Sequence, residues 1–333
     1  MSRLRSPDQI KAISIFGVVF IHASVLLGQD HLALGIARNL FRFDVPCFIM
    51  LWAFFFERSY ARRDREDRRD YTLDRFIDLF KDYLGWSILY FLVLADWGSL
   101  TPAKVLTTHF AGYGWSGQYF FIVLFQLLFL FPLIRFIYSR RVLRYLSLAV
   151  LSVVLVAYGY AYDHLPDLVQ KLGERPFYLW VPCTFAGIAL ARGKFPPLPA
   201  WSWLAVVLIP LEMYLLDSFG RNHYSHATPV VMVTSVLLFA SVVQADRWVR
   251  GRRARRGAAF LGSRTLIVFL ANPLIIHILM PFLPELLAGI RNPGLMLSIA
   301  LLLTVFVISV CLLIGALRNR VRAALLRPVR TLR

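Results

Sequence analysis

Charged residues are scarce in this chain. Only 17% of its 333 residues are Asp, Glu, Lys or Arg, while 58% are hydrophobic. Soluble domains carry about 25% charged residues, so this composition excludes that class and predicts a polytopic membrane protein. Cysteine is also rare, and the three cysteines all lie within apolar runs. No disulfide framework is therefore expected, and we expect no metal site.

Ten apolar segments are long enough, or nearly so, to cross a bilayer, which requires about 20 residues. They predict an all-α polytopic membrane protein with about ten transmembrane helices. We expect the whole chain, 1–333, to form a single integral membrane domain. The predicted segments are 8–28, 38–57, 79–96, 118–138, 143–162, 177–192, 201–217, 229–246, 263–283 and 294–317.

Acidic residues are few, with 19 against 37 Lys and Arg, and the net charge is +18. When the connecting segments are assigned alternately to two sides, 27 basic residues fall on one side and six on the other. The positive-inside rule then predicts that both termini are cytoplasmic, together with the charged loop 57–78 and the basic tail 318–333. We expect these basic residues to contact anionic lipid headgroups rather than nucleic acid.

Two ionisable residues lie within the first apolar segment, Lys11 and His22. Eleven helical residues turn through about 1100° and rise about 16 Å, so both side chains are predicted to share one face of the helix. Ionisable groups inside a bilayer are costly, and an aligned pair indicates a functional site. The alternative is a lysine that reaches the interface and a histidine that only bonds a neighbouring helix.

The pattern Asp8-x2-Lys11-x10-His22 resembles the first helix of the membrane acyltransferase-3 family. The resemblance spans the chain and includes the number of helices. Asn272 stands where that family often has a late histidine. Three further segments carry the resemblance: Arg42-Phe-Asp-Val-Pro-Cys-Phe, the aromatic run from Gly117 to Pro132, and Leu261-Gly-Ser-Arg-Thr followed by Ala271-Asn-Pro.

The resemblance implies an O-acyltransferase of the bacterial cytoplasmic membrane, which moves acetyl or another small acyl group from cytoplasmic acetyl-CoA to a hydroxyl of an extracytoplasmic polysaccharide or lipid-linked glycan. The phosphates of CoA would meet Lys11, Arg75, Lys81 and Arg58 through charge-assisted hydrogen bonds. His22 would either deprotonate the acceptor hydroxyl or carry the acyl group itself. The residues leave both routes open, and they leave the oligomeric state open.

A catalytic imidazole needs an orienting partner, and two carboxylates lie inside apolar segments. Asp44 is predicted in the second segment, where Arg42 could also neutralise it as a structural pair. Glu212 lies in the middle of the seventh segment, beside Pro210, and is harder to explain by structure alone. We therefore add Asp44 and Glu212 to His22 as candidate catalytic residues.

Four residues are candidates for contact with the acceptor. They are Arg42, Trp115, Tyr119 and Asn272. Aromatic faces suit the stacking of sugars, although Trp and Tyr also gather at bilayer interfaces, and buried amides often only join helices. The sequence His223-Tyr-Ser-His226 is predicted to be a solvated loop rather than a metal site.

A transporter or flippase for a glycan or a small anionic substrate is the alternative function. In that case Lys11 and His22 would mark a path for an ion or a substrate. Transporters are commonly built from paired repeats with helices broken by glycine, and no such symmetry is visible in this sequence. The sequence therefore favours the enzyme.

Overall fold

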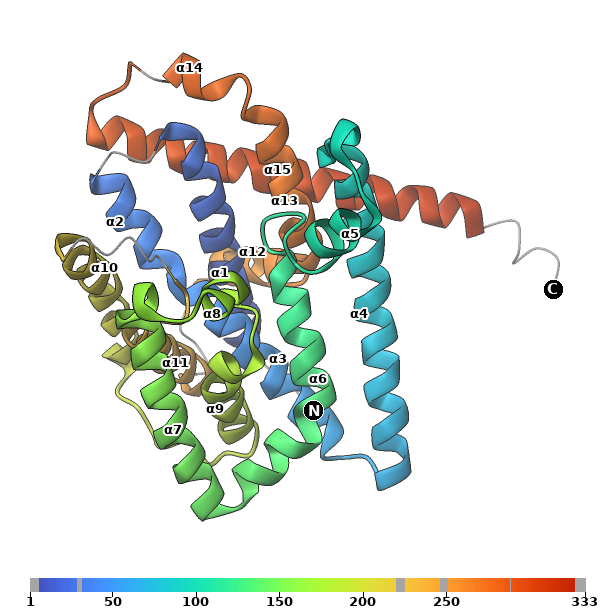
Figure 1. Ribbon diagram of the computed structural model, residues 1–333, viewed down its shortest axis with the longest axis vertical. Helices are drawn as coiled ribbons and strands as arrows, with labels where there is room; N and C mark the ends of the chain where they lie inside the picture. Colours follow the sequence, from blue (N-terminus) through green and yellow to red (C-terminus); the bar gives the residue numbers. More distant parts are fainter. Residues whose placement is uncertain (1–5, 29–31, 220–224, 246–250, 288, 327–333) are drawn as a thin grey trace.

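The computed structural model of the protein describes residues 6–28, 32–219, 225–245, 251–287 and 289–326, and all regular structure in these ranges is helical (Figure 1). The predicted all-α class is confirmed. The α-helices are α1 (Ser6–Ser24), α2 (Leu32–Leu40), α3 (Asp44–Tyr60), α4 (Arg65–Leu94), α5 (Pro102–Lys104), α6 (Gln118–Ser139), α7 (Arg141–Tyr160), α8 (Asp167–Leu172), α9 (Val181–Ala191), α10 (Leu208–Ser218), α11 (Pro229–Gln244), α12 (Arg252–Gly262), α13 (Thr265–Leu279), α14 (Leu283–Leu287) and α15 (Pro293–Leu326).

Short 3-10 and π turns extend or connect these helices. They are η1 (Val25–Leu27), η2 (Phe41–Phe43), η3 (Trp97–Ser99), the π-helical η4 (Val105–Phe110), η5 (Tyr162–His164), η6 (Phe177–Trp180) and η7 (Ala200–Val207). Several of them join directly onto an α-helix, so that α2, η2 and α3 form one nearly continuous element.

The helices of the protein coincide with the ten predicted apolar segments. Every predicted segment falls on a helix. Within the described ranges, six helices are long and apolar enough to span a bilayer, or seven if the bent pair of α12 and α13 counts as one span. The helices at 177–191 and 229–244 are apolar but shorter than a full crossing. The protein is thus an integral membrane protein, while the count of ten spans and the cytoplasmic termini stay predictions.

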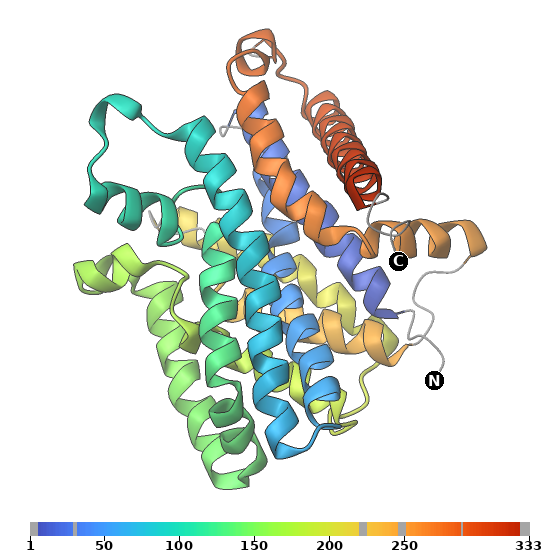
Figure 2. The same cartoon turned by 90° about the vertical axis from the view of Figure 1, so that its right-hand side faces the viewer.

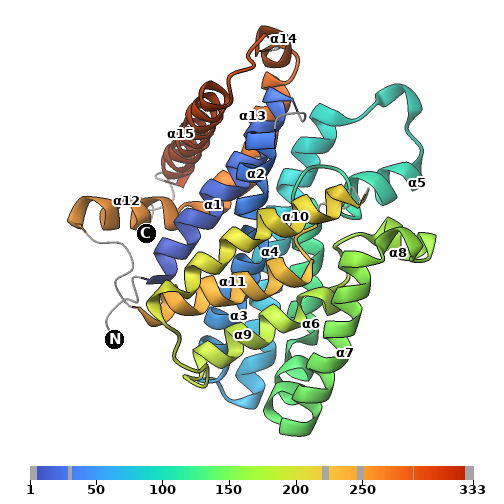
Figure 3. The same cartoon turned by 90° about the vertical axis from the view of Figure 1, so that its left-hand side faces the viewer.

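Helix α1 lies at the centre of the bundle, where α3, α12, α13 and α15 pack around it (Figure 3). In its most apolar window 67% of the residues are buried, against 17% in α7 and 28% in α15. A helix that is hydrophobic on all sides is stable only when other helices or lipid cover every side. The first segment is therefore the core of the protein, and α7 and α15 are left for contact with lipid.

Small residues allow the closest approach of helices, as is common in membrane bundles. Gly187 of α9 faces the backbone of α3, and a Cβ atom placed on it would lie 2.6 Å from the carbonyl oxygen of Met50. Gly262 at the end of α12 meets the carbonyl of Asp8 in the same way. Residues 263 and 264 then turn the chain by 70° into α13, so that α12 projects sideways with its arginines (Figure 2).

The charged segment 57–78 contains the turn between two helices and a carboxylate with long-range ion pairs. Helix α3 continues to Tyr60 and α4 begins at Arg65, so most of the charged segment is helical. Glu57 is 2% exposed and pairs with two arginines far away in the sequence, at 2.9 Å from Arg135 Nε and 2.8 Å from Arg192 Nε. It therefore fastens α3 to α6 and α9, since an unpaired charge at this depth would be costly.

Candidate active site

His22 lies near the carboxyl end of α1, and its ring is fixed by a residue of α13. The Nδ1 atom of His22 lies 2.7 Å from Oδ1 of Asn272. The Asn272 amide donates its Nδ2 hydrogens to the carbonyl oxygens of Val268 at 2.9 Å and Phe269 at 2.8 Å. Because Pro273 has no N–H, the Phe269 carbonyl lacks its usual helical partner, and the Asn272 side chain replaces that partner.

This arrangement determines the protonation of the imidazole. With both Nδ2 hydrogens directed at carbonyls, the atom of Asn272 that faces His22 is an acceptor, so Nδ1 of His22 must carry a hydrogen. In the neutral ring the lone pair is then on Nε2. The sequence marks Asn272 as a residue for acceptor contact, but the structure places it as the partner that orients His22.

Tyr90 of α4 bonds to the same part of α13, around Pro273. Its hydroxyl donates to the carbonyl of Leu270 at 2.8 Å and accepts from the N–H of Leu274 at 2.9 Å, so it is inserted into a helical hydrogen bond. The ring of Tyr90 is stacked on Trp115, with centroids 4.8 Å apart. The backbone around Asn272 is therefore held by α4 as well as by its own helix.

Two cavities meet at His22. The smaller has a volume of about 60 Å³ and the larger about 200 Å³. Of the residues predicted to contact the acceptor substrate, Tyr119 lines the smaller cavity and Trp115 lines the larger one. His277 also lines the larger cavity. The other residues around the smaller cavity are Val18, Ile21, Asp44, Val45, Gly117, Phe120, His226 and Phe269.

His226 was missed by the sequence analysis, which predicts a solvated loop there; His223 is outside the described residues. The side chain of His226 is only 17% exposed and lines the smaller cavity with His22. Its Nε2 lies 3.5 Å from Asp44 Oδ1, and its Nδ1 lies 3.2 Å from Glu174 Oε2. Thr228-Pro229 is a sequence signal for the start of a helix, and it could have indicated that His226 lies just before the first turn of α11.

Glu174 holds the segment before α11 in place. One of its carboxylate oxygens accepts hydrogen bonds from the backbone N–H of His226 and from the Ser225 hydroxyl, the latter at 2.6 Å. Burial alone would raise the pKa of the Glu174 carboxyl, but the His226 ring and these hydrogen bonds outweigh burial and lower the pKa to about 2. The carboxylate is therefore ionised at neutral pH.

Asp44 begins α3 and is 1% exposed at the wall of the smaller cavity. Its Oδ1 accepts the N–H of Val45 at 2.6 Å and faces His226. Its Oδ2 has no hydrogen-bond partner within the part of the chain that the structure describes. Arg42, two residues earlier, donates through Nε to Asn39 Oδ1 at 2.9 Å. Asp44 therefore lines the same cavity as His22, while the imidazole that it faces is that of His226.

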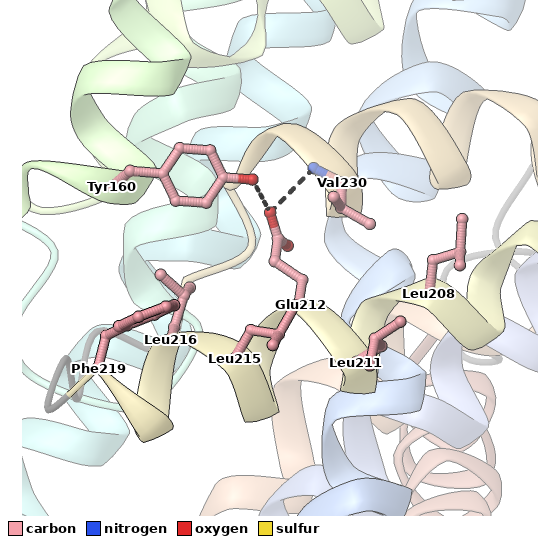
Figure 4. A pocket seen from close by; sticks show the side chains of 8 residues that line it. All are labelled: Tyr160, Leu208, Leu211, Glu212, Leu215, Leu216, Phe219 and Val230. Carbon is pink, nitrogen blue, oxygen red and sulfur yellow. Dashed lines mark hydrogen bonds between the residues drawn. The ribbon is translucent and has the colours of Figure 1, made fainter.

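Glu212 does not line either cavity at His22. It is 6% exposed and accepts hydrogen bonds from the Tyr160 hydroxyl, from Thr228 Oγ1 at 2.6 Å and from Val230 N at 3.2 Å. Figure 4 shows its carboxylate directed at Tyr160 and Val230, beside a groove of about 670 Å³. Glu212 thereby fixes the first turn of α11, just after His226. The rest of the groove is apolar and is lined by Leu208, Leu211, Leu215, Leu216 and Phe219.

The four cations predicted for CoA do not meet at a single point. Lys11 Nζ lies 4.9 Å from the centroid of the Phe55 ring, and the guanidinium of Arg58 lies 5.4 Å from that of Phe54. Both cations therefore lie against aromatic rings of α3. Arg75 on α4 is more than half exposed and lies 3.8 Å from Asp78.

Lys81 is associated with a residue that the sequence analysis did not single out. It lines a cavity of about 230 Å³ together with Asp82, Trp86 and Arg318 of α15. Arg318 lies 3.6 Å from Asp82. A second cation therefore stands near Lys81, contributed by the last helix.

Comparison with known proteins places the chain in a family. A family model described as an acyltransferase domain, that of the acyltransferase-3 family, matches residues 4–316. No curated protein and no solved structure matches the chain. Because the family match covers nearly the whole chain, the protein belongs to the acyltransferase-3 family and is an acyltransferase.

Proposed function

We propose that the protein is an O-acyltransferase of the bacterial cytoplasmic membrane. It transfers acetyl, or another small acyl group, from cytoplasmic acetyl-CoA to a hydroxyl of an extracytoplasmic polysaccharide or of its lipid-linked precursor. The observation that carries this proposal is the 2.7 Å contact of His22 Nδ1 with Asn272 Oδ1. It gives a partly buried imidazole one free lone pair, next to two cavities.

A free Nε2 lone pair serves acyl transfer in two ways. It can remove the proton of the acceptor hydroxyl, or it can attack the thioester carbonyl and carry the acyl group. Both uses require that the ring keeps one tautomer and one orientation, which Asn272 provides. The partial burial of the ring favours either reaction, because it limits the access of water that would hydrolyse a thioester or an acylated imidazole.

The donor is proposed to approach from the end of the bundle that carries most of the basic residues. CoA has several phosphates and is cytoplasmic, and 27 basic residues are assigned to this side. Lys11 and Arg58 on one side, and Lys81 with Arg318 on the other, offer charge-assisted hydrogen bonds to phosphate. Arg75, which is exposed, could join them as the ligand enters.

The acceptor is proposed to approach the opposite end, where His22 lies. Trp115 and Tyr119 present aromatic walls to the two cavities, and Arg42 lies close to the start of α3. Aromatic rings pack against the apolar faces of sugars while hydroxyls point to polar groups. A glycan hydroxyl that enters the smaller cavity would reach both His22 and Asp44.

The proposal is tested with purified protein in lipid nanodiscs, radiolabelled acetyl-CoA and lipid-linked glycans from the source membrane. We expect acetyl transfer without any ion gradient. His22→Ala should lower the rate at least about 100-fold, because general acid–base groups typically contribute 10²–10⁴-fold. The matched control is His164→Ala, since His164 is an exposed histidine of η5, away from the cavities at His22. Loss of activity in both variants, or in neither, would contradict the assignment of His22.

A further inference from the structure

Three ionisable side chains form a line that leads away from the smaller cavity. Asp44 is 1% exposed, and its Oδ1 lies 3.5 Å from Nε2 of His226. Nδ1 of His226 lies 3.2 Å from Glu174 Oε2. The side chain of Asp44 is 1% exposed, whereas those of His226 and Glu174 are 17% and 15% exposed, so the far members of the line are the more accessible ones. A carboxylate, an imidazole and a carboxylate in this order can pass a proton outward.

The chemistry of acyl transfer leaves a task that His22 alone cannot perform. If Nε2 of His22 carries the acyl group, its lone pair is used in the new bond. Its Nδ1 hydrogen is held by Asn272, so the ring then has no site for another proton. The hydroxyl that attacks this acyl group must nevertheless lose its proton, and a second base is required.

We propose that Asp44, His226 and Glu174 form a proton relay that removes the proton of the acceptor hydroxyl while His22 carries the acyl group. This inference rests on the proposed function. It assigns catalysis to Asp44, whose Oδ2 meets the hydroxyl, and it makes His226 and Glu174 positioning residues that act through Asp44.

The two steps balance in atoms and charge. First, Nε2 of His22 bonds to the acyl carbon, the C–S bond breaks, and CoA leaves as a thiolate that is protonated by water on its own side. The acylated His22 is cationic, because Nδ1 keeps its hydrogen. Next, the acceptor oxygen bonds to the acyl carbon, the C–N bond breaks, and the hydroxyl proton passes to Asp44. His22 is again neutral, and the proton leaves through His226 and Glu174.

The free oxygen of Asp44 points to a ligand rather than to a purely structural ion pair. Within the described ranges Oδ2 of Asp44 has no hydrogen-bond partner, although Asp44 lines a cavity. A buried acceptor without a partner costs about 1–3 kcal/mol, and more for a charged group. A structural pair would engage both oxygens, as Glu57 does with Arg135 and Arg192. An acceptor hydroxyl would satisfy Oδ2 of Asp44.

The orientation of the relay is also built into the fold. Glu174 Oε1 is occupied by the His226 backbone N–H and by Ser225, which leaves Oε2 for the imidazole. Glu212 fixes Thr228 and Val230, directly after His226. The imidazole is therefore positioned from both ends of its segment.

The test separates the two half-reactions. Exchange of labelled CoA into acetyl-CoA, without acceptor, measures acylation and deacylation of His22. Transfer to the glycan measures both steps. We expect His226→Gln to lower transfer at least about 100-fold, the usual contribution of a proton-transferring group, while exchange stays within about threefold. Asp44→Asn should show the same split, because an amide keeps the size of the side chain but accepts no proton.

Glu174→Gln provides a second variant in case His226→Gln fails to fold. The amide oxygen can still accept from Ser225 and from the His226 N–H, so the segment before α11 keeps its shape. The same split is expected, with a smaller loss of transfer because the carboxylate acts through His226. Melting temperatures of all variants verify folding.

Several results would overturn the relay. If transfer and exchange fall together in the folded variants, the three residues only support the structure. If transfer is unchanged, they are not needed for the proton. A wild-type protein that transfers acetyl but shows no exchange would mean that His22 is not acylated and can serve as the base itself. A wild-type protein that neither transfers nor exchanges would instead refute the proposed function.

Discussion

The removal of the Asn272 side chain should lower both catalysis and stability, each for its own reason. In Asn272→Ala, His22 loses the acceptor of its Nδ1 hydrogen, and the Phe269 carbonyl loses its replacement partner. A neutral hydrogen bond contributes about 0.5–1.5 kcal/mol, which corresponds to about a 2- to 12-fold change in rate. Rotation of the freed ring adds to this, since a displacement of 1 Å can cost about 100-fold. We therefore expect kcat to fall about 10- to 100-fold.

The same substitution should also lower stability, for a different reason. Pro273 cannot supply a backbone N–H to the Phe269 carbonyl, so this buried oxygen is left unpaired in the variant. Such a group costs about 1–3 kcal/mol. Asn272→Asp would lose the donor but keep an acceptor for His22 Nδ1, so its kcat should exceed that of the alanine variant while its stability stays low.

The measurement is kcat from the release of CoA thiol, together with the melting temperature in nanodiscs. Thr304→Val is the matched control, because it removes a buried hydrogen bond of α15, from Thr304 Oγ1 to the Ala300 carbonyl at 2.7 Å. The control should lose stability but keep its kcat. If Asn272→Ala melts earlier yet keeps kcat within twofold of wild type, Asn272 supports only the helix, and the reasoning about the tautomer is refuted.

Three further outcomes follow from the sequence and the packing. Lys11→Ala should raise the KM for acetyl-CoA while Lys11→Arg retains it, because either cation can meet a phosphate; an unchanged KM in the alanine variant would place Lys11 outside the donor site. Gly187→Ala should destabilise the protein by about 1–3 kcal/mol, since its Cβ would lie 2.6 Å from a backbone oxygen of α3. Gly85→Ala is the control, because Gly85 has open space around it. Equal melting temperatures of the two variants would contradict this packing. A cysteine at Lys104 should react with an impermeant maleimide only from outside the cell, and reaction from the cytoplasm alone would invert the topology.

The positions of the helices and the family could be read from the sequence. Apolar runs of about 20 residues form helices wherever lipid or other helices surround them, because the backbone must satisfy its own hydrogen bonds. The motif around Lys11 and His22 lies within a single helix, so its spacing depends only on local geometry. Both the all-helical fold and the acyltransferase family are confirmed.

The partners of the candidate catalytic residues were decided by tertiary structure alone. Asn272 meets His22 across 250 residues of sequence, and the interpretation of Asn272 as an acceptor contact came from its motif position only. His226 and Glu174 lie in segments whose composition is typical of loops, yet both side chains are partly buried, and His226 packs against Asp44 of α3. Glu212 shows the converse, since its depth in an apolar helix predicts a role in the site, whereas the fold pairs it with Tyr160 and Thr228. Apolar periodicity determines which residues are helical and buried, but nearly any helix can cover another apolar face. Which polar side chains meet is therefore decided by the few places, such as Pro273 and Gly187, where shape permits only one packing.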